Sequence, residues 1–289
     1  MKVLVIGGTG MVGSQTVKEL LARHVDVRVL TRSEEKAQSL PAGAEAVIGD
    51  ILDPHTVRSI FKGMDGVFMV NPVSTTETSE GLFAVNGARM AGIKRFVYMT
   101  VHEYDKAVHL PHFGSKLAIE AAIRDSGMEY TFLRPNNFYQ NDNWFKDAIL
   151  QYGVYPQPIG DVGISRVDVR DIAEAAAIAL TTEGHNGEIY NLVGPEPMTG
   201  QRTAEIWSEA LGTTVTYGGN DLDAWEQQAT QFFPAWMAFD FRLMFEYFNK
   251  EGLKATAQDI ERQTKLLGHA PRSFEAYAQE SAKAWKVVA

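Results

Sequence analysis

Short apolar runs alternate with longer amphipathic segments through the first two-thirds of the chain. The apolar runs have the length and continuity of strands that are buried on both faces of a sheet. Between them, apolar residues recur at the i, i+3, i+4 spacing of a helix, as at Val17, Leu20 and Leu21. This alternation predicts a parallel sheet wound with crossover helices, which is the doubly wound α/β class. The six expected strands are Lys2 to Ile6, Val25 to Leu30, Ala44 to Ile48, Gly66 to Val70, Arg95 to Met99 and Tyr130 to Leu133.

The pattern loosens after the sixth strand and then recovers. From Asn136 to about Gly163 the chain is rich in Asn, Tyr, Pro and Gly, which predicts loops that connect elements and form part of the site. An Ala-rich helix over Asp168 to Leu180 and a strand over Glu188 to Val193 are expected to return to the same sheet. Later residues carry helical patterns alone. The expected domains are 1–155 with 164–194 returning to it, and a smaller, mostly helical domain facing the substrate over 195–289.

Composition narrows the class of protein. Hydrophobic residues make up 45% and charged residues 22% of the 289 positions, as in a globular protein with a sizeable core. The formal net charge of −9, without any run of Lys or Arg, argues against direct nucleic-acid contact. Cysteine is absent, which excludes disulfides, thiolate nucleophiles and iron–sulfur clusters and fits a reducing cytoplasm. No apolar stretch approaches the roughly 18 to 20 residues that span a bilayer, so we expect a soluble cytoplasmic protein without a membrane partner.

A glycine-rich turn follows the first strand in the segment VLVIGGTGMVGSQTVKELL. Gly8, Gly10 and Gly13 match the GxGxxG template, and Gly7, Gly10 and Gly13 match the GxxGxxG template. Such a turn lets the backbone approach a dinucleotide pyrophosphate, which the helix N-terminus then binds. The alternative is a merely structural turn. The residues expected to contact the cofactor here are Gly7, Thr9, Gly10, Met11, Val12 and Gly13.

The end of the second strand predicts which dinucleotide binds. An NAD site places Asp or Glu about 20 residues after the glycines, but this position holds Arg32 between Thr31 and Ser33. A guanidinium can pair bidentately with a 2′-phosphate, so NADP is favoured over NAD. The alternative is a solvated arginine that pairs with Glu34 or Glu35.

Two further strand ends are expected beside the cofactor. Asp50 and Ile51 follow the third strand, where a carboxylate could accept a hydrogen bond from the adenine amino group. Asp50 could equally cap the following turn. Asn71 and Pro72 close the fourth strand, and a loop at this edge of the sheet would lie beside the nicotinamide ribose.

With these pieces in place, the chain resembles the NmrA-like branch of the atypical short-chain dehydrogenases, which includes triphenylmethane reductases, NADPH:quinone reductases and redox-sensing regulators. The resemblance spans nearly the whole chain and implies a Rossmann fold that binds NADP. The matching segments are GGTGMVG at the start, KRFVYMT at 94–100, SKLAIEAAIRDSGMEYTFLRPNNFYQN at 115–141, VDVRDIA at 167–173, GEIYNLVGPE at 187–196 and APRSFEAYAQESAKAW near the C-terminus.

The resemblance also implies roles for single residues. It implies that Gly7, Gly10 and Gly13 form the pyrophosphate loop and that Arg32 binds the 2′-phosphate. Thr100 resembles the serine or threonine that short-chain dehydrogenases place beside the substrate, and Lys116 resembles the lysine that binds the nicotinamide ribose. Pro135, Asn136 and Asn137 resemble the segment that passes under the nicotinamide.

One position departs from the family pattern. The YxxxK pair of short-chain dehydrogenases would place its tyrosine at position 112, where this chain has His112. A histidine four residues before Lys116 lies on the same helix face and could donate the proton, because histidines titrate near neutral pH. The alternative is that proton donation has been lost. Lys116 also has a structural alternative, a surface pair with Glu120.

Two other groups of residues bear on the chemistry of the chain. His102, His109 and His112 match no zinc spacing, so we expect no metal site. Nine of the chain's 30 aromatic residues fall between Asp221 and Lys250, where an even distribution would give about three. This aromatic segment is either a helical core or homodimer face, or an apolar wall or lid over a substrate site.

Two functions from different classes remain. The first is an NADPH-dependent oxidoreductase that reduces a small apolar carbonyl, quinone or dye-like acceptor, with walls from the aromatic segment and from Tyr139, Trp144, Tyr152 and Tyr155. The second is a non-catalytic regulator that senses NADP(H) and acts through a protein partner. The missing tyrosine favours the regulator, and the aromatic side chains favour the oxidoreductase.

Overall fold

The computed structural model describes residues 1–288, with side chains as far as Trp285. The chain forms two compact units. The first unit contains Met1–Pro135 and Val169–Tyr190, and the second contains Asn136–Asp168 and the chain from Asn191 onward. The first unit therefore ends at 135, not at the expected 155. Residues after 135 fold with the second unit because their hydrogen bonds are made there, as in the pair Tyr139 N–H to Val167 O at 2.9 Å.

A seven-stranded parallel sheet forms the centre of the first unit, in the order β3-β2-β1-β4-β5-β6-β8. The expected doubly wound fold and its seven strands are confirmed, with ends displaced by no more than two residues. The order reverses between β1 and β4, the place where open α/β sheets bind ligands at the carboxyl ends of their strands. The strands are β1 (Lys2–Ile6), β2 (Asp26–Thr31), β3 (Ala44–Ile48), β4 (Gly66–Met69), β5 (Arg95–Met99), β6 (Glu129–Pro135) and β8 (Glu188–Leu192).

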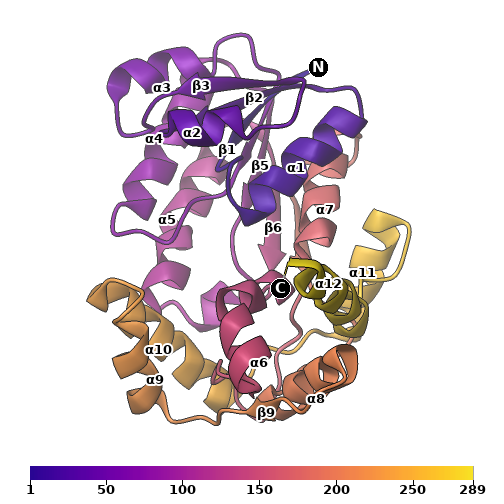
Figure 1. Ribbon diagram of the computed structural model, residues 1–289. Coiled ribbons are helices and arrows are strands. Elements are labelled where there is room, and N and C mark those ends of the chain that lie inside the picture. Colours follow the sequence, from indigo (N-terminus) through magenta and orange to yellow (C-terminus); the bar gives the residue numbers. More distant parts are fainter. Residues whose placement is uncertain (289) are drawn as a thin grey trace. The chain divides into compact units, whose positions relative to one another are not determined.

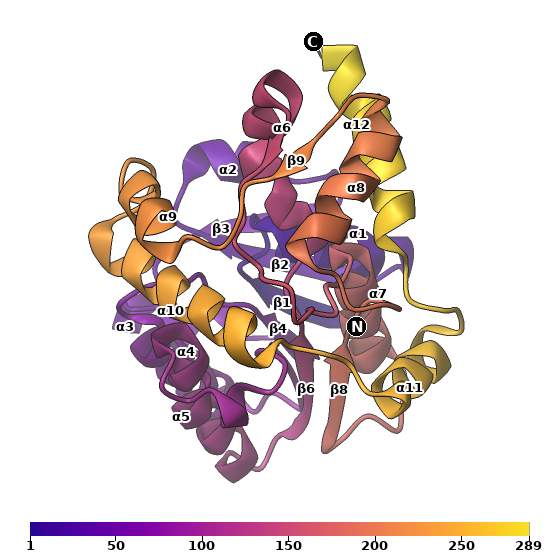
Figure 2. The ribbon, with the colours of Figure 1, turned by 90° about the horizontal axis from the view of Figure 1, so that it is seen from below.

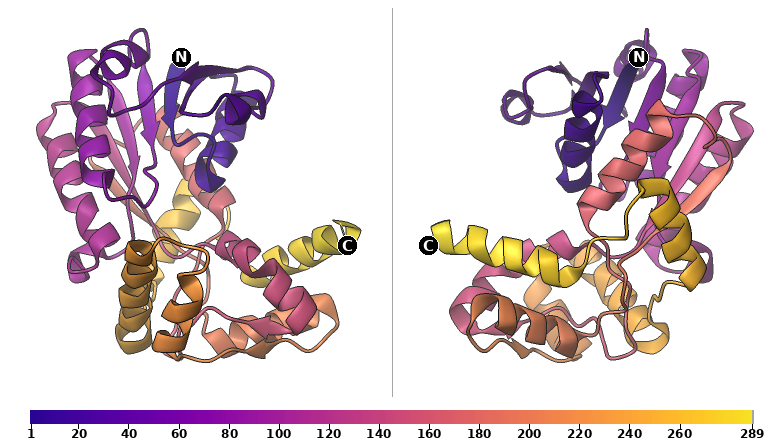
Figure 3. Two further views of the ribbon diagram at one scale, coloured as in Figure 1. Left: turned by 60° about the vertical axis from the view of Figure 1, so that its left-hand side comes forward. Right: turned by 90° about the vertical axis from the view of Figure 1, so that its right-hand side faces the viewer.

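Helices cover both faces of this sheet (Figure 1). Helices α1 (Met11–Ala22) and α7 (Val169–Thr181) pack together on one face, and Figure 3 shows salmon-coloured α7 lying along the strands. Alanines on α7 permit this close packing, since Ala173, Ala176 and Ala177 are fully buried. The other face carries α3 (Pro54–Ile60), α4 (Glu77–Met90) and α5 (Pro111–Asp125). Two short elements complete the unit, α2 (Glu34–Gln38) and the 3-10 turn η1 (Tyr104–Lys106).

The second unit is mostly helical, and Figure 2 shows α8 beside α12 and α9 beside α10.

The loops expected over 136–163 are wrong in part, because this segment contains the helical elements η2 and α6. Gly153, which suggested a loop, ends α6 in the left-handed region at φ 61°. Two unexpected two-residue strands, β7 and β9, pair in parallel. Within residues 1–288 no helix is both long and apolar enough to cross a membrane. The elements are η2 (Tyr139–Phe145), α6 (Lys146–Tyr152), β7 (Val154–Tyr155), α8 (Gly200–Leu211), β9 (Thr216–Tyr217), α9 (Leu222–Ala229), α10 (Ala235–Glu251), α11 (Ala257–Leu267) and α12 (Phe274–Val288).

A fully buried ion pair lies at the centre of the second unit. Arg166 Nη2 is 2.6 Å from Asp142 Oδ1, and both side chains have no exposed surface. Gln157 and Trp207 donate to the same carboxylate at 2.7 and 2.9 Å. Burial opposes the charge of Arg166, yet the neighbouring Asp142 raises its pKa above the ordinary value. Every charge in this cluster is therefore compensated, as a dry interior requires.

A second buried carboxylate fastens α5 to β6 in the first unit. Glu120 has no exposed surface and accepts two hydrogen bonds from Arg134, at 3.2 Å to Oε1 and 2.9 Å to Oε2. The Tyr104 hydroxyl and Arg124 each donate to Oε2 at 3.0 Å. Burial, and then the charge of Glu120, raise the pKa of Tyr104. The bidentate pair fixes α5, which carries His112 and Lys116, against the strand that ends at Pro135.

We predict that Glu120→Gln lowers the free energy of unfolding by about 3 kcal/mol, because it leaves Arg134 without a charged partner in a largely buried place. The matched control is Glu129→Gln, which removes a half-exposed carboxylate paired with Arg95 and should cost less than about 1 kcal/mol. Urea denaturation followed by circular dichroism measures both values. Equal losses in the two variants would contradict the fastening role of Glu120.

Candidate cofactor and catalytic site

The turn between β1 and α1 leaves no room for side chains at two of its glycines. Gly7 has φ 82°, and a Cβ added there would lie 2.3 Å from the carbonyl oxygen of Val70. A Cβ added at Gly13 would lie 2.1 Å from the carbonyl oxygen of Gly7. Both positions therefore require glycine, the first for its backbone conformation and the second for the close approach of α1 to β1.

Gly10 differs from its neighbours because it faces open space. A Cβ added there would meet a single atom, the Gly7 carbonyl oxygen at 3.3 Å. Gly10 is also the N-cap of α1, a helix of 12 residues, and no side chain caps the first amide groups. An open space before uncapped N–H groups fits a pyrophosphate. Thr9 and Met11 are partly exposed beside this space, whereas Val12 is buried and can offer only its backbone.

Arg32 follows β2 as an exposed cation. Among the described residues it forms no ion pair, so the alternative of pairing with Glu34 or Glu35 is not what the structure has. The neighbouring hydroxyls are used within the chain: Thr31 Oγ1 accepts from the Ser33 N–H at 3.2 Å, and Ser33 Oγ accepts from an N–H of α2. Arg32 is therefore the group at this strand end that is available to a 2′-phosphate.

The ends of β3 and β4 differ in what they offer. Asp50 Oδ1 accepts a hydrogen bond from the Leu52 N–H at 2.9 Å and so builds the turn, and the side chain of Ile51 is buried. Asn71, just after β4, is 8% exposed, and its Oδ1 has no hydrogen-bond partner among the described residues. Pro72 beside it is exposed. An unsatisfied buried acceptor at the point where the strand order reverses fits a bound molecule with N–H or O–H donors.

The residues expected to act on the substrate lie after β5 and at the start of α5. Thr100 is buried, its hydroxyl bonds to the Val101 N–H, and its own N–H donates to Leu133 O at 2.8 Å. His112 lies in the first turn of α5 and is partly exposed. Its ring packs edge-on against Phe113, with ring centres 4.7 Å apart.

Lys116 has a partner that the sequence did not suggest. Its ammonium group pairs with Oε1 of Glu77, the first residue of α4, and both side chains are buried. The alternative of a surface pair with Glu120 is not what the structure has, because that carboxylate is held by Arg134 and Arg124. An acidic residue in the first turn of a helix is common because it interacts favourably with the helix dipole. The position of Glu77 in the sequence therefore does not indicate that it contacts Lys116.

Pro135, Asn136 and Asn137 span the boundary between the units, with Pro135 ending β6. In the second unit, Asn136 Nδ2 donates to Leu253 O at 2.8 Å, and Asn137 Oδ1 accepts from Arg166 Nε at 3.1 Å. Both side chains therefore hold segments of the second unit together. Their expected contact with the nicotinamide stays a prediction.

The aromatic segment divides into buried and exposed side chains. Trp225 packs edge-on against Phe245 at 4.8 Å, and both are buried. Tyr139 and Tyr155, which we expected in an apolar wall, are fully buried in the core of the second unit. The exposed aromatic side chains of this unit are Trp144, Tyr152, Phe232, Trp236 and Phe239.

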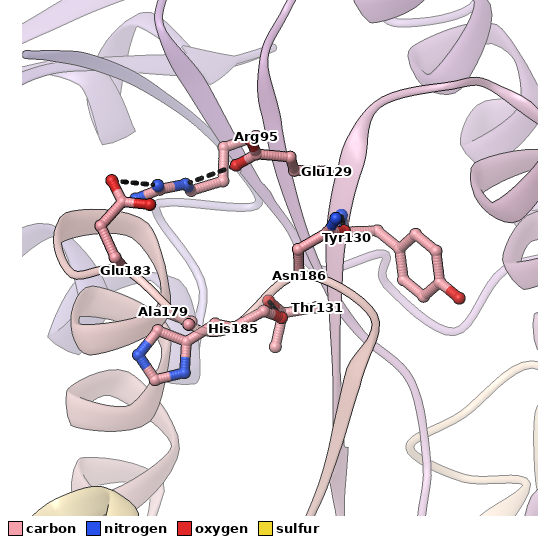
Figure 4. A pocket seen from close by; sticks show the side chains of 9 residues that line it. Arg95, Glu129, Tyr130, Thr131, Ala179, Glu183, His185 and Asn186 are labelled. Carbon is pink, nitrogen blue, oxygen red and sulfur yellow. Dashed lines mark hydrogen bonds and ion pairs between the residues drawn. The ribbon is translucent and has the colours of Figure 1, made fainter.

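A small polar pocket of about 70 Å³ lies at the opposite edge of the sheet, where β5 and β6 begin (Figure 4). Both of its carboxylates are paired with the same arginine, since Arg95 lies 3.4 Å from Glu129 and 2.8 Å from Glu183. Burial, and then the charge of Arg95, lower the pKa of His185. The pocket lies at the amino ends of the strands, whereas the glycine turn follows the carboxyl end of β1. Its lining residues are Arg95, Glu129, Tyr130, Thr131, Ala179, Glu183, Gly184, His185 and Asn186.

Comparisons with known proteins agree with this geometry. The model of the NmrA-like family matches residues 1–278. The chain is 30% identical to an NAD(P)H azoreductase of Xenophilus azovorans, over 98% of this chain and 99% of that protein. It is 31% identical to a (4-alkanoyl-5-oxo-2,5-dihydrofuran-3-yl)methyl phosphate reductase of Streptomyces griseus, again over 98% and 99%. The crystal structure of the Citrobacter sp. triphenylmethane reductase with NADP(H) superposes with a TM-score of 0.83 at 26% identity, covering 98% of this chain and 100% of that one.

We predict that Gly10→Val weakens NADPH binding by at least ~100-fold and leaves the melting temperature near that of the parent, because the added side chain fills the open space and its Cβ meets a single atom of the fold, the Gly7 carbonyl oxygen at 3.3 Å. Gly13→Val is the contrasting variant, and it should prevent folding of the first unit because its side chain would overlap the backbone of Gly7. Calorimetric titration and thermal denaturation measure the two effects. A Gly10→Val protein that binds NADPH as tightly as the parent would show that the turn is only structural.

Proposed function

The chain belongs to the NmrA-like family, and on that basis we propose that it is an NADPH-dependent reductase of small molecules. The observation that carries this proposal is the open space at Gly10 before the uncapped N-terminus of α1, with Arg32 available at the end of the neighbouring strand. A phosphate-binding turn and a free cation for a 2′-phosphate are what NADP requires.

The cofactor is NADP(H). The backbone from Gly7 to Gly13 binds its pyrophosphate, and Arg32 binds the 2′-phosphate. Lys116 holds the nicotinamide ribose, and Asn71 Oδ1 accepts from a donor of the nicotinamide half. The triphenylmethane reductase structure, which is a complex with NADP(H), and the azoreductase, which is named for NAD(P)H, support this assignment.

The acceptor is a small apolar carbonyl, quinone or dye-like molecule. Trp144, Phe232, Trp236 and Phe239 are exposed aromatic side chains of the second unit, and a flat acceptor can stack on such rings. The three relatives described above are named for three different acceptors at similar identity. The reductase class is therefore better supported than any one acceptor.

When bound, the cofactor supplies two electrons as hydride. The chain's own residues orient the reactants and supply the proton that the reduced acceptor needs. His112 donates that proton from its ring, since it is the partly exposed titratable side chain at the tyrosine position of the family pattern. Thr100 lies at the end of β5, and Lys116 holds the ribose from a buried position one helical turn beyond His112.

We predict that Arg32→Ala removes most of the preference for NADPH over NADH. A hydrogen bond to a charged group contributes about 1.5 to 3 kcal/mol, so the affinity for NADPH should fall roughly 10- to 100-fold while that for NADH changes little. Calorimetric titration with both dinucleotides makes the comparison. If NADH binds the parent protein as well as NADPH does, the assignment of NADP is wrong.

We predict that His112→Ala lowers turnover by about 10²- to 10⁴-fold and leaves NADPH affinity nearly unchanged, the result expected when a general acid is removed. The readout is NADPH oxidation with a panel of quinones, azo dyes and aldehydes. If an acceptor is reduced almost as fast by the His112→Ala protein as by the parent, His112 is not the proton donor, and the proposal of a reductase still holds. If no acceptor oxidises NADPH with the parent protein, the non-catalytic sensor becomes the better description.

A further inference from the structure

Glu77 lies where a cofactor-binding residue would be needed. It is the first residue of α4, and the segment that precedes it leaves the carboxyl end of β4, beside β1. Helices α4 and α5 pack side by side on one face of the sheet (Figure 1), and the Thr78 hydroxyl donates to Ser115 O at 3.4 Å. Glu77 therefore belongs to the sheet edge that carries Asn71 and the glycine turn.

The two charges of the Glu77 and Lys116 pair are almost completely buried. Glu77 is 2% exposed and Lys116 is 6% exposed. Neither ion would be stable alone in such a place, so the two charges compensate each other. A lysine ammonium group can donate hydrogen bonds but cannot accept one.

One carboxylate oxygen of Glu77 has no hydrogen-bond donor among the described residues. Oε1 binds Lys116, whereas Oε2 is buried and has no hydrogen-bond partner among the described residues. The other two buried carboxylates described above differ in this respect, because Glu120 and Asp142 accept hydrogen bonds on both oxygens. A buried carboxylate oxygen without a donor is costly to the fold, which points to a donor that does not belong to the chain.

We propose that Glu77 is a cofactor-binding residue whose Oε2 accepts a hydrogen bond from a hydroxyl of the nicotinamide ribose, while its Oε1 positions Lys116 to donate to the same ribose. This inference rests on the proposed binding of NADPH. A ribose diol both donates and accepts, and the pair offers one acceptor and one donor side by side. Asn71 Oδ1 is also an unpartnered acceptor, but no hydrogen bond from a cation of the described residues reaches it, so it suits another donor of the cofactor.

The test compares NADPH with adenosine 2′,5′-bisphosphate, which carries the adenosine half of the cofactor and lacks the nicotinamide ribose. Glu77→Gln should weaken NADPH binding roughly 10- to 100-fold, as expected for the loss of a charge-assisted hydrogen bond. Binding of adenosine 2′,5′-bisphosphate should stay within about twofold, because its contacts lie elsewhere. Calorimetric titration measures both affinities without any turnover.

Glu80→Gln is the matched control. Glu80 lies one turn further along α4, is similarly buried at 6%, and accepts from the Thr76 hydroxyl at 2.7 Å. This variant should bind both ligands as the parent does. An equal loss of NADPH affinity in the two variants, or a loss of both ligands in Glu77→Gln, would mean that the carboxylate only supports the fold and would overturn the proposal.

A second variant covers the case in which Glu77→Gln does not fold. Glu77→Asp keeps the negative charge near Lys116 but shortens the side chain by one methylene, so it cannot serve both the lysine and the ribose. It should lose NADPH affinity and keep affinity for adenosine 2′,5′-bisphosphate, and full NADPH affinity would overturn the role of Oε2. If the parent protein binds neither ligand, the proposed cofactor itself is wrong.

Discussion

The close approach of α1 to β1 is the constraint on which the first unit depends. Gly13 lies against the backbone of Gly7, and no side chain fits between them. This contact sets the direction in which α1 leaves the sheet, and with it the direction of the unpaired N–H groups at the start of the helix. The packing of α7 on α1 follows from it, because both helices share one face of the sheet. The same turn thus provides a close packing contact at Gly13 and an open space at Gly10.

The three buried carboxylates described above differ in how many of their oxygens accept hydrogen bonds. Asp142 is surrounded by Arg166, Gln157 and Trp207, and it has no capacity left for a ligand. Glu120 is satisfied in the same way and serves to hold α5 on β6. Glu77 is almost as deeply buried, at 2% exposed, and only one of its oxygens accepts a hydrogen bond from a described residue. Burial and charge alone would not separate these three residues, whereas a count of hydrogen bonds on each oxygen does.

Local patterns predicted most of the first unit but little of the second. The strands were evident because each is a short apolar run next to a helical pattern, and the glycine turn and Arg32 follow directly from their places after β1 and β2. The contact of Lys116 with Glu77 joins residues on two different helices, and no local spacing relates them. The frequent Asn and Gly residues between 136 and 163 predict loops, yet Gly153 ends a helix. Tyr139 and Tyr155 look like substrate contacts in the sequence and are core residues, since burial depends on distant segments.

The division of the chain between its two units has a consequence for synthesis. The chain passes from the first unit to the second after Pro135, returns at Val169, and leaves again after Tyr190. During translation, six strands of the sheet are made long before α7 and β8, which cover its face and complete its edge. An emerging chain that forms these six strands leaves the β6 edge unpaired and apolar surface uncovered until residue 192, the end of β8, has left the ribosome. Slow synthesis between residues 136 and 192 would prolong that exposure and favour association with chaperones.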